Sequence, residues 1–160
     1  MRKGAPPADG GVKSVAQNKR ARFDYAIEDH VEAGLVLSGS EVKSLRQGNV
    51  ALSDAYATVR GGELWLVNCR IGEYQAASFF GHLPLRDRKL LVRRAELEKL
   101  TGKVEQRGYS LVPLSIYFRG GWAKVDLGLG RGKTHEDRRE DISAREQKRE
   151  MERALSRRRR

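Results

Sequence analysis

The sequence predicts a mainly β protein with short helices: a small antiparallel β-barrel of about six strands and two to three helices, followed by a basic tail. Three observations predict this fold. Short segments alternate between apolar and polar residues, the two-residue period of half-buried strands. Two pairs of glycines separate such segments, as in hairpin turns. After Gly130 large apolar residues become rare, so the barrel is expected to end there.

The chain divides into three predicted parts. Residues 1–17 are rich in Gly, Ala and Pro and lack periodicity, so we expect a disordered leader. Residues 18–130 carry the strand patterns and form the predicted barrel domain. Residues 131–160 form the basic tail. At 160 residues the chain is long enough for one such domain with its own core.

The barrel is predicted to begin with two strand segments and a short helix. Apolar residues alternate from Phe23 to Ile27 and again from Val31 to Leu37, with a bend expected at Asp29–His30 between them. Ser38 and Glu41 then have the spacing of a capping box, which starts a helix. This helix is expected to brace a β-rich core.

Two hairpins and a second helix complete the predicted barrel. The turn Gly61–Gly62 leads to a return strand whose apolar face is expected to be Trp65, Val67, Cys69 and Ile71. A helix follows, with Leu97, Leu100 and Val104 on one face. The second hairpin turns at Gly120–Gly121, and Pro113 predicts an edge or a bulge in its first strand. Six short strands with two helices fit an oligonucleotide-binding type of barrel.

The tail is expected to be disordered alone and helical against a polyanion. It carries +5 of the net charge of +11. Pairs such as Asp141 with Arg145 favour a helix, but each contributes only about 0.2–0.5 kcal/mol. No apolar stripe is present to hold that helix on the barrel.

Composition restricts the partners and the compartment. The net charge of +11 indicates a polyanion, either nucleic acid or an anionic membrane surface. Cys69 is the single cysteine, so no internal disulfide can form. There is no signal peptide and no apolar run near the roughly 18 to 20 residues of a membrane span. We expect a cytoplasmic protein with no membrane partner.

Catalytic and metal sites are not predicted. His30, His82 and His135 are far apart in sequence and lack metal-ligand spacing with Cys69. No phosphate loop, dinucleotide fingerprint or nucleophile elbow occurs. The prediction is therefore a protein that is not an enzyme, with no catalytic residue, metal or cofactor.

Basic clusters near aromatic residues are the strongest binding signal. Lys19, Arg20 and Arg22 precede the first strand, and a second cluster includes Arg88 and Lys89. RNA recognition combines cations on phosphates with rings on unstacked bases. Each cluster alone could also be a set of solvated charges, but the basic tail strengthens the RNA interpretation.

Several motifs occur in a fixed order along the chain. They are Asn18-Lys19-Arg20-Ala21-Arg22, Glu32-Ala33-Gly34, Gly39-Ser40-Glu41-Val42-Lys43-Ser44-Leu45-Arg46, Arg88-Lys89-Leu90-Leu91, and Gly132-Lys133 followed by Asp137-Arg138-Arg139. From about Asn18 to the C-terminus the chain resembles the SmpB family, the SsrA-binding proteins of bacterial trans-translation.

The resemblance implies an RNA-binding adaptor. Its barrel would bind the elbow of the tRNA-like domain of transfer-messenger RNA (tmRNA) and deliver that RNA to stalled ribosomes for peptide tagging. Asn18, Glu32 and Leu91 match positions that the family uses for this contact. With the basic clusters, the expected tmRNA-binding residues are Asn18, Lys19, Arg20, Arg22, Phe23, Glu32, Arg88, Lys89 and Leu91.

The resemblance also implies a role for the tail on the ribosome. In the family, a complex with alanylated tmRNA and elongation factor Tu enters the stalled ribosome. The tail then lies as a helix near the decoding centre and in the empty message channel of the small subunit. The expected ribosome-binding residues are Gly132, Lys133, His135, Asp137, Arg138, Arg139, Arg145, Lys148 and Arg149. The protein is expected to be monomeric.

Three positions depart from the family pattern. Phe23 stands where many relatives have His, Thr134 replaces a common Lys, and Glu136 stands where an aromatic residue or His is usual. His135 is displaced by one position, so stacking on a ribosomal base at this point would depend on it.

Two other functions fit parts of the sequence. A ribosomal or assembly protein could place the barrel on ribosomal RNA and thread the tail inside the particle; it would co-sediment with unstalled subunits at high salt. An RNA-processing enzyme would need clustered carboxylates, whereas Asp24, Glu32 and Asp54 are scattered along the chain.

Overall fold

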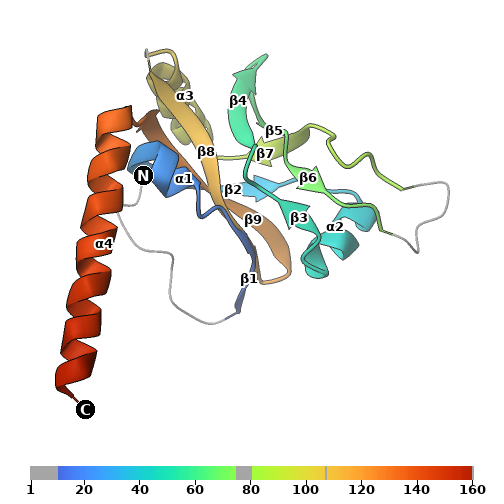
Figure 1. Cartoon of the computed structure of the whole chain (residues 1–160). Coiled ribbons are helices and arrows are strands. Elements are labelled where there is room, and N and C mark those ends of the chain that lie inside the picture. The colour runs from blue at the N-terminus through green and yellow to red at the C-terminus, as the bar shows by residue number, and fades with distance from the viewer. Residues whose placement is uncertain (1–10, 75–80, 107, 160) are drawn as a thin grey trace.

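A computed structural model describes residues 11–74, 81–106 and 108–159, which form a β-barrel and a long helix that projects from it (Figure 1). The strands in this part of the chain are β1 (Val12–Gln17), β2 (Tyr25–Leu35), β3 (Val50–Ala51), β4 (Tyr56–Arg60), β5 (Glu63–Val67), β6 (Arg70–Ile71), β7 (Arg88–Leu91), β8 (Tyr109–Arg119) and β9 (Trp122–Gly132). The helices are α1 (Ala21–Asp24), α2 (Gly39–Arg46), α3 (Arg94–Val104) and α4 (His135–Arg158).

Six antiparallel strands form the barrel wall, in the order β8-β4-β5-β7-β2-β9. The long strands β8 and β9 pair along most of their length, which joins the two ends of the sheet. The join between β4 and β8 is the weakest, with the single pair Ala57–Leu111. The predicted oligonucleotide-binding-like antiparallel barrel is therefore confirmed, in a nearly closed form.

The core is filled from the strands and from two of the helices. Alternate residues of β2 and β9, such as Val31, Ala33 and Val125, point inward and are buried. Leu45 of α2 and Leu100 of α3 are completely buried against them. The two helices thus brace the barrel, as the capping box and the Leu97–Val104 pattern predict, and the Ser38–Glu41 box is present.

Local signals placed the turns correctly. Gly61, Gly62, Gly120 and Gly121 all have positive φ, which glycine adopts without strain. The register of β8 shifts between Pro113 and Ser115, which confirms the predicted bulge. The bend expected at Asp29–His30 is a bulge between Ile27 and Asp29 within one continuous strand.

The prediction of a disordered leader is wrong for Val12–Gln17. These residues form β1, which pairs with β8 from Ser115 to Arg119. The edge of β8 beyond its short contact with β4 is free to accept another strand, and this backbone pairing needs little apolar alternation. Residues 1–10 lie outside the described part of the chain.

The predicted apolar face of the return strand is wrong for Trp65 and Val67 of β5 and correct for Cys69 and Ile71. Leu64 and Leu66 point into the core, while Trp65 and Val67 are half-buried on the other side. Asn68 has φ 56° and interrupts the strand, so the inward positions change from even to odd numbers. Cys69 and Ile71 are then buried beyond this break.

Candidate nucleic-acid interface

The outer face of β7, β2, β9 and β8 carries three of the predicted RNA-binding residues. Glu32 lies on β2, and Lys89 and Leu91 lie on β7. The strands register Gly34 against both Leu91 and Lys124, so β7 and β9 flank β2 on either side. Side chains alternate across a strand, so Glu32, Lys89 and Leu91 point away from the core that holds Ala33 and Leu90.

Glu32 is held by two neighbours on β8. The hydroxyl of Tyr117 donates a hydrogen bond to its carboxylate, and the guanidinium of Arg119 lies 3.0 Å from it. Burial and this hydrogen bond raise the pKa of Tyr117 above its usual range, so the hydroxyl remains a donor. Glu32 therefore orients a cation on the outer face, although it cannot itself attract phosphate.

Leu91 is an exposed apolar residue beside a glycine. Its side chain is 54% exposed, and it lies over Gly34, where an added Cβ would be 3.4 Å from the Leu91 Cβ. Lys89 is also on the outer face and forms an ion pair with Glu63 at 2.9 Å. This part of the interface is apolar with a charged border.

Arg88 does not belong to the interface, and its prediction as an RNA-binding residue is wrong. Its side chain is completely buried, and its guanidinium binds the carboxylate of Glu41, which is buried as well. It also donates hydrogen bonds to the backbone carbonyls of Cys69 and Pro84. Arg88 occupies an inward position of β7, where a charge needs such partners.

The Glu41 carboxylate has three hydrogen-bond donors. Burial alone would raise its pKa, but hydrogen bonds from Arg86, the Ser38 amide and Arg88 outweigh burial and lower the pKa to about 2. The same carboxylate closes the capping box of α2. Glu41, Ser44 and Leu45 of the Gly-Ser-Glu-Val-Lys-Ser-Leu-Arg block thus belong to the core, whereas Lys43 and Arg46 are exposed.

Asn18 is buried and fully engaged with the backbone. Its amide nitrogen donates to the carbonyls of Leu52 and Pro113, at 3.2 and 3.0 Å, and its oxygen accepts from the Ala21 amide at 3.2 Å. This side chain joins the start of α1 to the barrel wall. Asn18 therefore positions α1 and does not present its amide to the surface.

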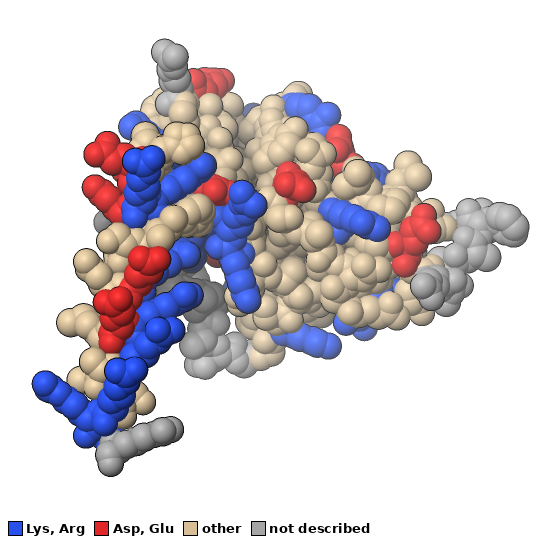
Figure 2. Space-filling view, viewed as in Figure 1, with Lys and Arg blue, Asp and Glu red and all other residues tan. Residues whose placement is uncertain are grey.

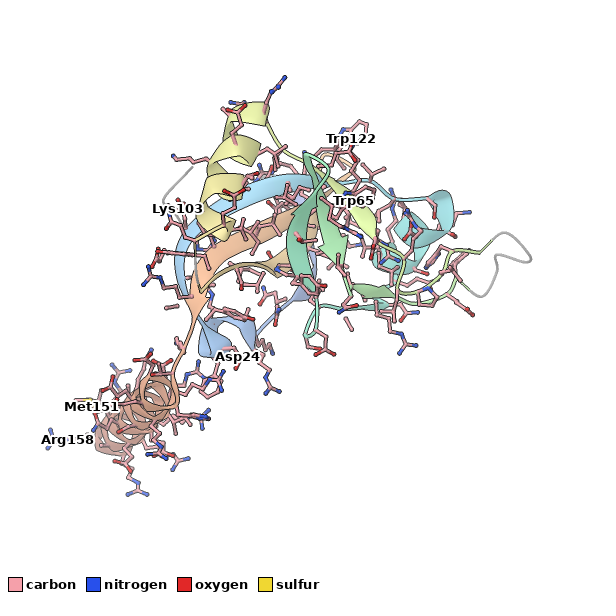
Figure 3. The ribbon with its side chains drawn as sticks, turned by 90° about the horizontal axis from the view of Figure 1, so that it is seen from above. Asp24, Trp65, Lys103, Trp122, Met151 and Arg158 are labelled. Carbon is pink, nitrogen blue, oxygen red and sulfur yellow. The ribbon has the colours of Figure 1, made fainter. Side chains whose placement is uncertain are left out.

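Lys19, Arg20 and Arg22 are exposed around α1, close to the tail. Arg20 forms an ion pair with Asp24 at 3.1 Å. In Figure 3, Asp24 and the tail lie on one side of the barrel, and Trp122 lies on the other. Apart from the buried Asn18 and Arg88, the predicted tmRNA-binding residues therefore fall on two surfaces, one around α1 and one on the outer face of β7, β2, β9 and β8.

The first turns of α4 are held on α1 by polar contacts, which we call the α1–α4 junction. The Lys133 ammonium donates to the Arg22 carbonyl at 2.9 Å and binds Asp141. Arg138 reaches Asp24 at 3.6 Å. The Arg145 guanidinium lies 5.6 Å from the centre of the Phe23 ring. No side chain of α4 is buried, so these contacts replace the apolar stripe that the sequence lacks.

A second capping box starts α4. The Thr134 hydroxyl accepts from the Asp137 amide at 3.2 Å, and the Asp137 carboxylate accepts from the Thr134 amide at 3.1 Å. The Thr134 hydroxyl also donates to the Asp137 carboxylate at 2.9 Å, and the two hydrogen bonds that this carboxylate accepts lower the pKa of Asp137. Two predicted tail residues, Lys133 and Asp137, thus have structural contacts at the start of the helix.

The remaining predicted tail residues are solvent-exposed: Gly132, His135, Arg139, Lys148 and Arg149. Figure 2 shows Lys and Arg side chains gathered toward the free end of α4. Such a helix presents cations to anything that surrounds it.

Within residues 11–74, 81–106 and 108–159, no group of three or more metal-ligating side chains comes together. None of the helices in this part of the chain is long and apolar enough to cross a membrane. A cavity of about 410 Å³ opens where β4 and β8 diverge, lined in part by Tyr25, Tyr56 and Tyr109.

Trp122 is a large exposed residue that the sequence analysis did not single out. It opens β9 and is 74% exposed on the barrel surface. Its place directly after the Gly120–Gly121 turn is the sequence signal that could have identified it, because hairpin ends project from a barrel.

A family model and similar known proteins point to the same protein family. The family model described as SmpB protein matches residues 15–157. An SsrA-binding protein of Anaeromyxobacter sp. (strain K) is 69% identical over 157 residues, which cover 98% of this chain and 96% of the relative. An SsrA-binding protein of Myxococcus xanthus (strain DK1622) is 62% identical over 151 residues, which cover 94% of this chain and 93% of the relative.

A solved structure has the same fold. It is described as "tmRNA-SmpB: a journey to the center of the bacterial ribosome" and is 48% identical in sequence, with a TM-score of 0.64. The match covers 79% of this chain and 93% of the solved chain.

Proposed function

Because the chain belongs to the SmpB family, we propose that it is an RNA-binding adaptor of trans-translation that binds the tRNA-like domain of tmRNA and delivers it to stalled ribosomes. The observation that carries the proposal is the match over residues 15–157, which includes both the barrel and most of the tail. Relatives at 69% and 62% identity are named SsrA-binding proteins, and the similar solved structure is described as tmRNA-SmpB on the bacterial ribosome.

The barrel and the tail take different parts of this task. Glu32, Lys89 and Leu91 on the outer face, with Lys19, Arg20 and Arg22 around α1, are the proposed tmRNA contacts. Asn18 supports α1 from beneath. The exposed cations support this assignment, because phosphate contacts supply most of the sequence-independent affinity for RNA.

The tail is proposed to enter the ribosome as a helix. Lys133, Arg138 and Arg145 set the direction of α4 at the α1–α4 junction. His135, Arg139, Lys148 and Arg149 are exposed and available to ribosomal RNA. A helix with cations on several sides suits a channel walled by RNA.

The same role implies further properties of the protein. The protein needs no cofactor or metal and is not an enzyme, because its task is to position RNA. It acts as a monomer in the cytoplasm, and it meets elongation factor Tu only through the shared RNA.

Two measurements test the proposal. Purified protein should bind tmRNA in preference to an unrelated structured RNA of equal length, in competition at physiological salt. Added to a reconstituted translation system that reads a message without a stop codon, it should give peptide tagging that depends on tmRNA. Equal affinity for both RNAs and no tagging would refute the proposal. Firm co-sedimentation with unstalled subunits at high salt would favour a ribosomal protein.

A further inference from the structure

Trp122 is a large aromatic side chain with no role in the core. It is 74% exposed at the start of β9, directly after the β8–β9 turn. An exposed ring of this size leaves apolar area in water that a binding partner could cover. Figure 3 shows it at the rim of the barrel, away from Met151 and Arg158 of the tail.

Trp122 lies in an apolar patch that crosses neighbouring strands. Gly34 of β2 pairs with both Lys124 of β9 and Leu91 of β7. Val36, the first residue after β2, and Trp122 of β9 each lie two positions from this pair, so their side chains point to the same outer face. Val36 and Leu91 are 43% and 54% exposed. We call Val36, Leu91 and Trp122 the apolar patch.

Cations border this patch. Arg119 is directly opposite Trp122 in the hairpin, and Glu32 holds its guanidinium at 3.0 Å. Lys124 lies on the same face and forms no ion pair with any residue that the structure describes. The apolar patch thus includes one proposed tmRNA contact, Leu91, and lies on the same face as another, Glu32.

We propose that Trp122 is a stacking platform for one unstacked base of the bound tmRNA, with Val36 and Leu91 as its apolar border and Lys124 against the adjacent phosphate. The inference rests on the proposed function, because it assigns a contact within that RNA complex. An exposed ring beside cations is the arrangement that binds unpaired nucleotides, since every base has a π-face. The positive charge beside the ring favours an anionic partner such as RNA over a neutral protein surface.

Substitution of Trp122 tests how much its ring contributes to the free energy of tmRNA binding. Trp122→Ala should weaken tmRNA binding by roughly 5- to 150-fold, the range for loss of one base–aromatic stack, and Trp122→Phe should recover most of the affinity. Leu83→Ala is the matched control, because Leu83 is also 74% exposed but lies in the segment between β6 and β7. The Leu83→Ala variant should bind tmRNA with the same affinity as the unmodified protein.

Fluorescence tests the contact itself. The chain has two tryptophans, so Trp65→Phe leaves Trp122 as the sole indole. In this variant, tmRNA should quench Trp122 emission and protect the ring from acrylamide, at the RNA concentration where binding saturates. If tmRNA binds normally but Trp122 remains accessible and Trp122→Ala binds at full strength, the inference is wrong and the proposed function stands. If the unmodified protein does not prefer tmRNA, both are wrong.

Discussion

Arg88 and Lys89 are neighbours on β7 but lie on opposite sides of the barrel wall. The Arg88 guanidinium is buried against Glu41, while the Lys89 ammonium pairs with Glu63 near the surface. An ion pair in the core costs the hydration of both charges, and loss of one partner leaves the other charge uncompensated. The two residues should therefore respond very differently to substitution.

Arg88→Ala should destabilise the fold strongly. It leaves the Glu41 carboxylate buried with fewer donors, which typically costs about 3–5 kcal/mol. Lys89→Ala removes a pair whose side chains are 40% and 46% exposed, so its loss should stay below about 1 kcal/mol. Denaturant unfolding of the two variants measures both values. Similar small losses would show that Arg88 is not an essential part of the core.

The stability of the fold should also fall in acid through Glu41. The pKa of Glu41 is about 2 in the folded state, against an ordinary value of 4.5, so the unfolded state binds the proton more readily. Its contribution is complete above about pH 4.5 and is lost as the pH falls toward 2. The amide of the Glu41→Gln variant cannot titrate. The free energy of unfolding of this variant should therefore change less steeply with pH across this window than that of the unmodified protein. Parallel curves for both proteins would contradict the assignment.

At the scale of single residues, contacts between residues close in sequence were predictable, and contacts between distant residues were not. The capping-box spacing of Ser38 and Glu41 was sufficient to identify the α2 start, because such boxes depend only on local spacing. The pairing of Glu41 with Arg88 was not predictable, because 47 positions separate them and charge alone does not show which side of a strand faces inward. Arg88 therefore looked like part of a basic RNA-binding cluster.

The elements show the same contrast between local and distant causes. Hairpins at Gly61–Gly62 and Gly120–Gly121 were predictable, since a turn needs only its own residues. β1 was not, because Val12–Gln17 is ordered by the available edge of β8 rather than by its own pattern. The direction of α4 was also hidden, since it depends on contacts with Phe23 and Asp24 more than a hundred residues earlier.

Thr134→Ala should weaken the start of α4. The substitution removes the hydroxyl that accepts from the Asp137 amide and typically costs about 1 kcal/mol of helix stability. NMR chemical shifts should show reduced helix content over residues 135–141. Ser156→Ala, far from the cap in the same helix, is the matched control and should leave this region unchanged. A helix that is unaffected by Thr134→Ala would show that the α1–α4 junction alone orders it.

The whole molecule consists of a barrel and a helix that projects from it (Figure 1). The outer face with Trp122 and the α4 helix lie on different sides of the barrel (Figure 3). The expected boundary at Gly130 needs adjustment, because Gly132 still pairs with Tyr25 and the Lys133 amide donates to the Asp24 carbonyl. A cut after Lys133 therefore removes α4 and leaves the barrel wall complete.

Removal of residues 134–160 should separate RNA capture from ribosome rescue. The shortened protein should keep most of its tmRNA affinity, because the outer face and the cations around α1 remain. The slope of log affinity against log salt concentration should change by less than one unit, since each phosphate contact contributes about 0.7–0.9. Peptide tagging on stalled ribosomes should collapse, because no helix is left to enter the message channel. If the shortened protein instead bound tmRNA no better than an unrelated basic protein, the tail would be the main RNA anchor, and the role of the barrel would be to support it.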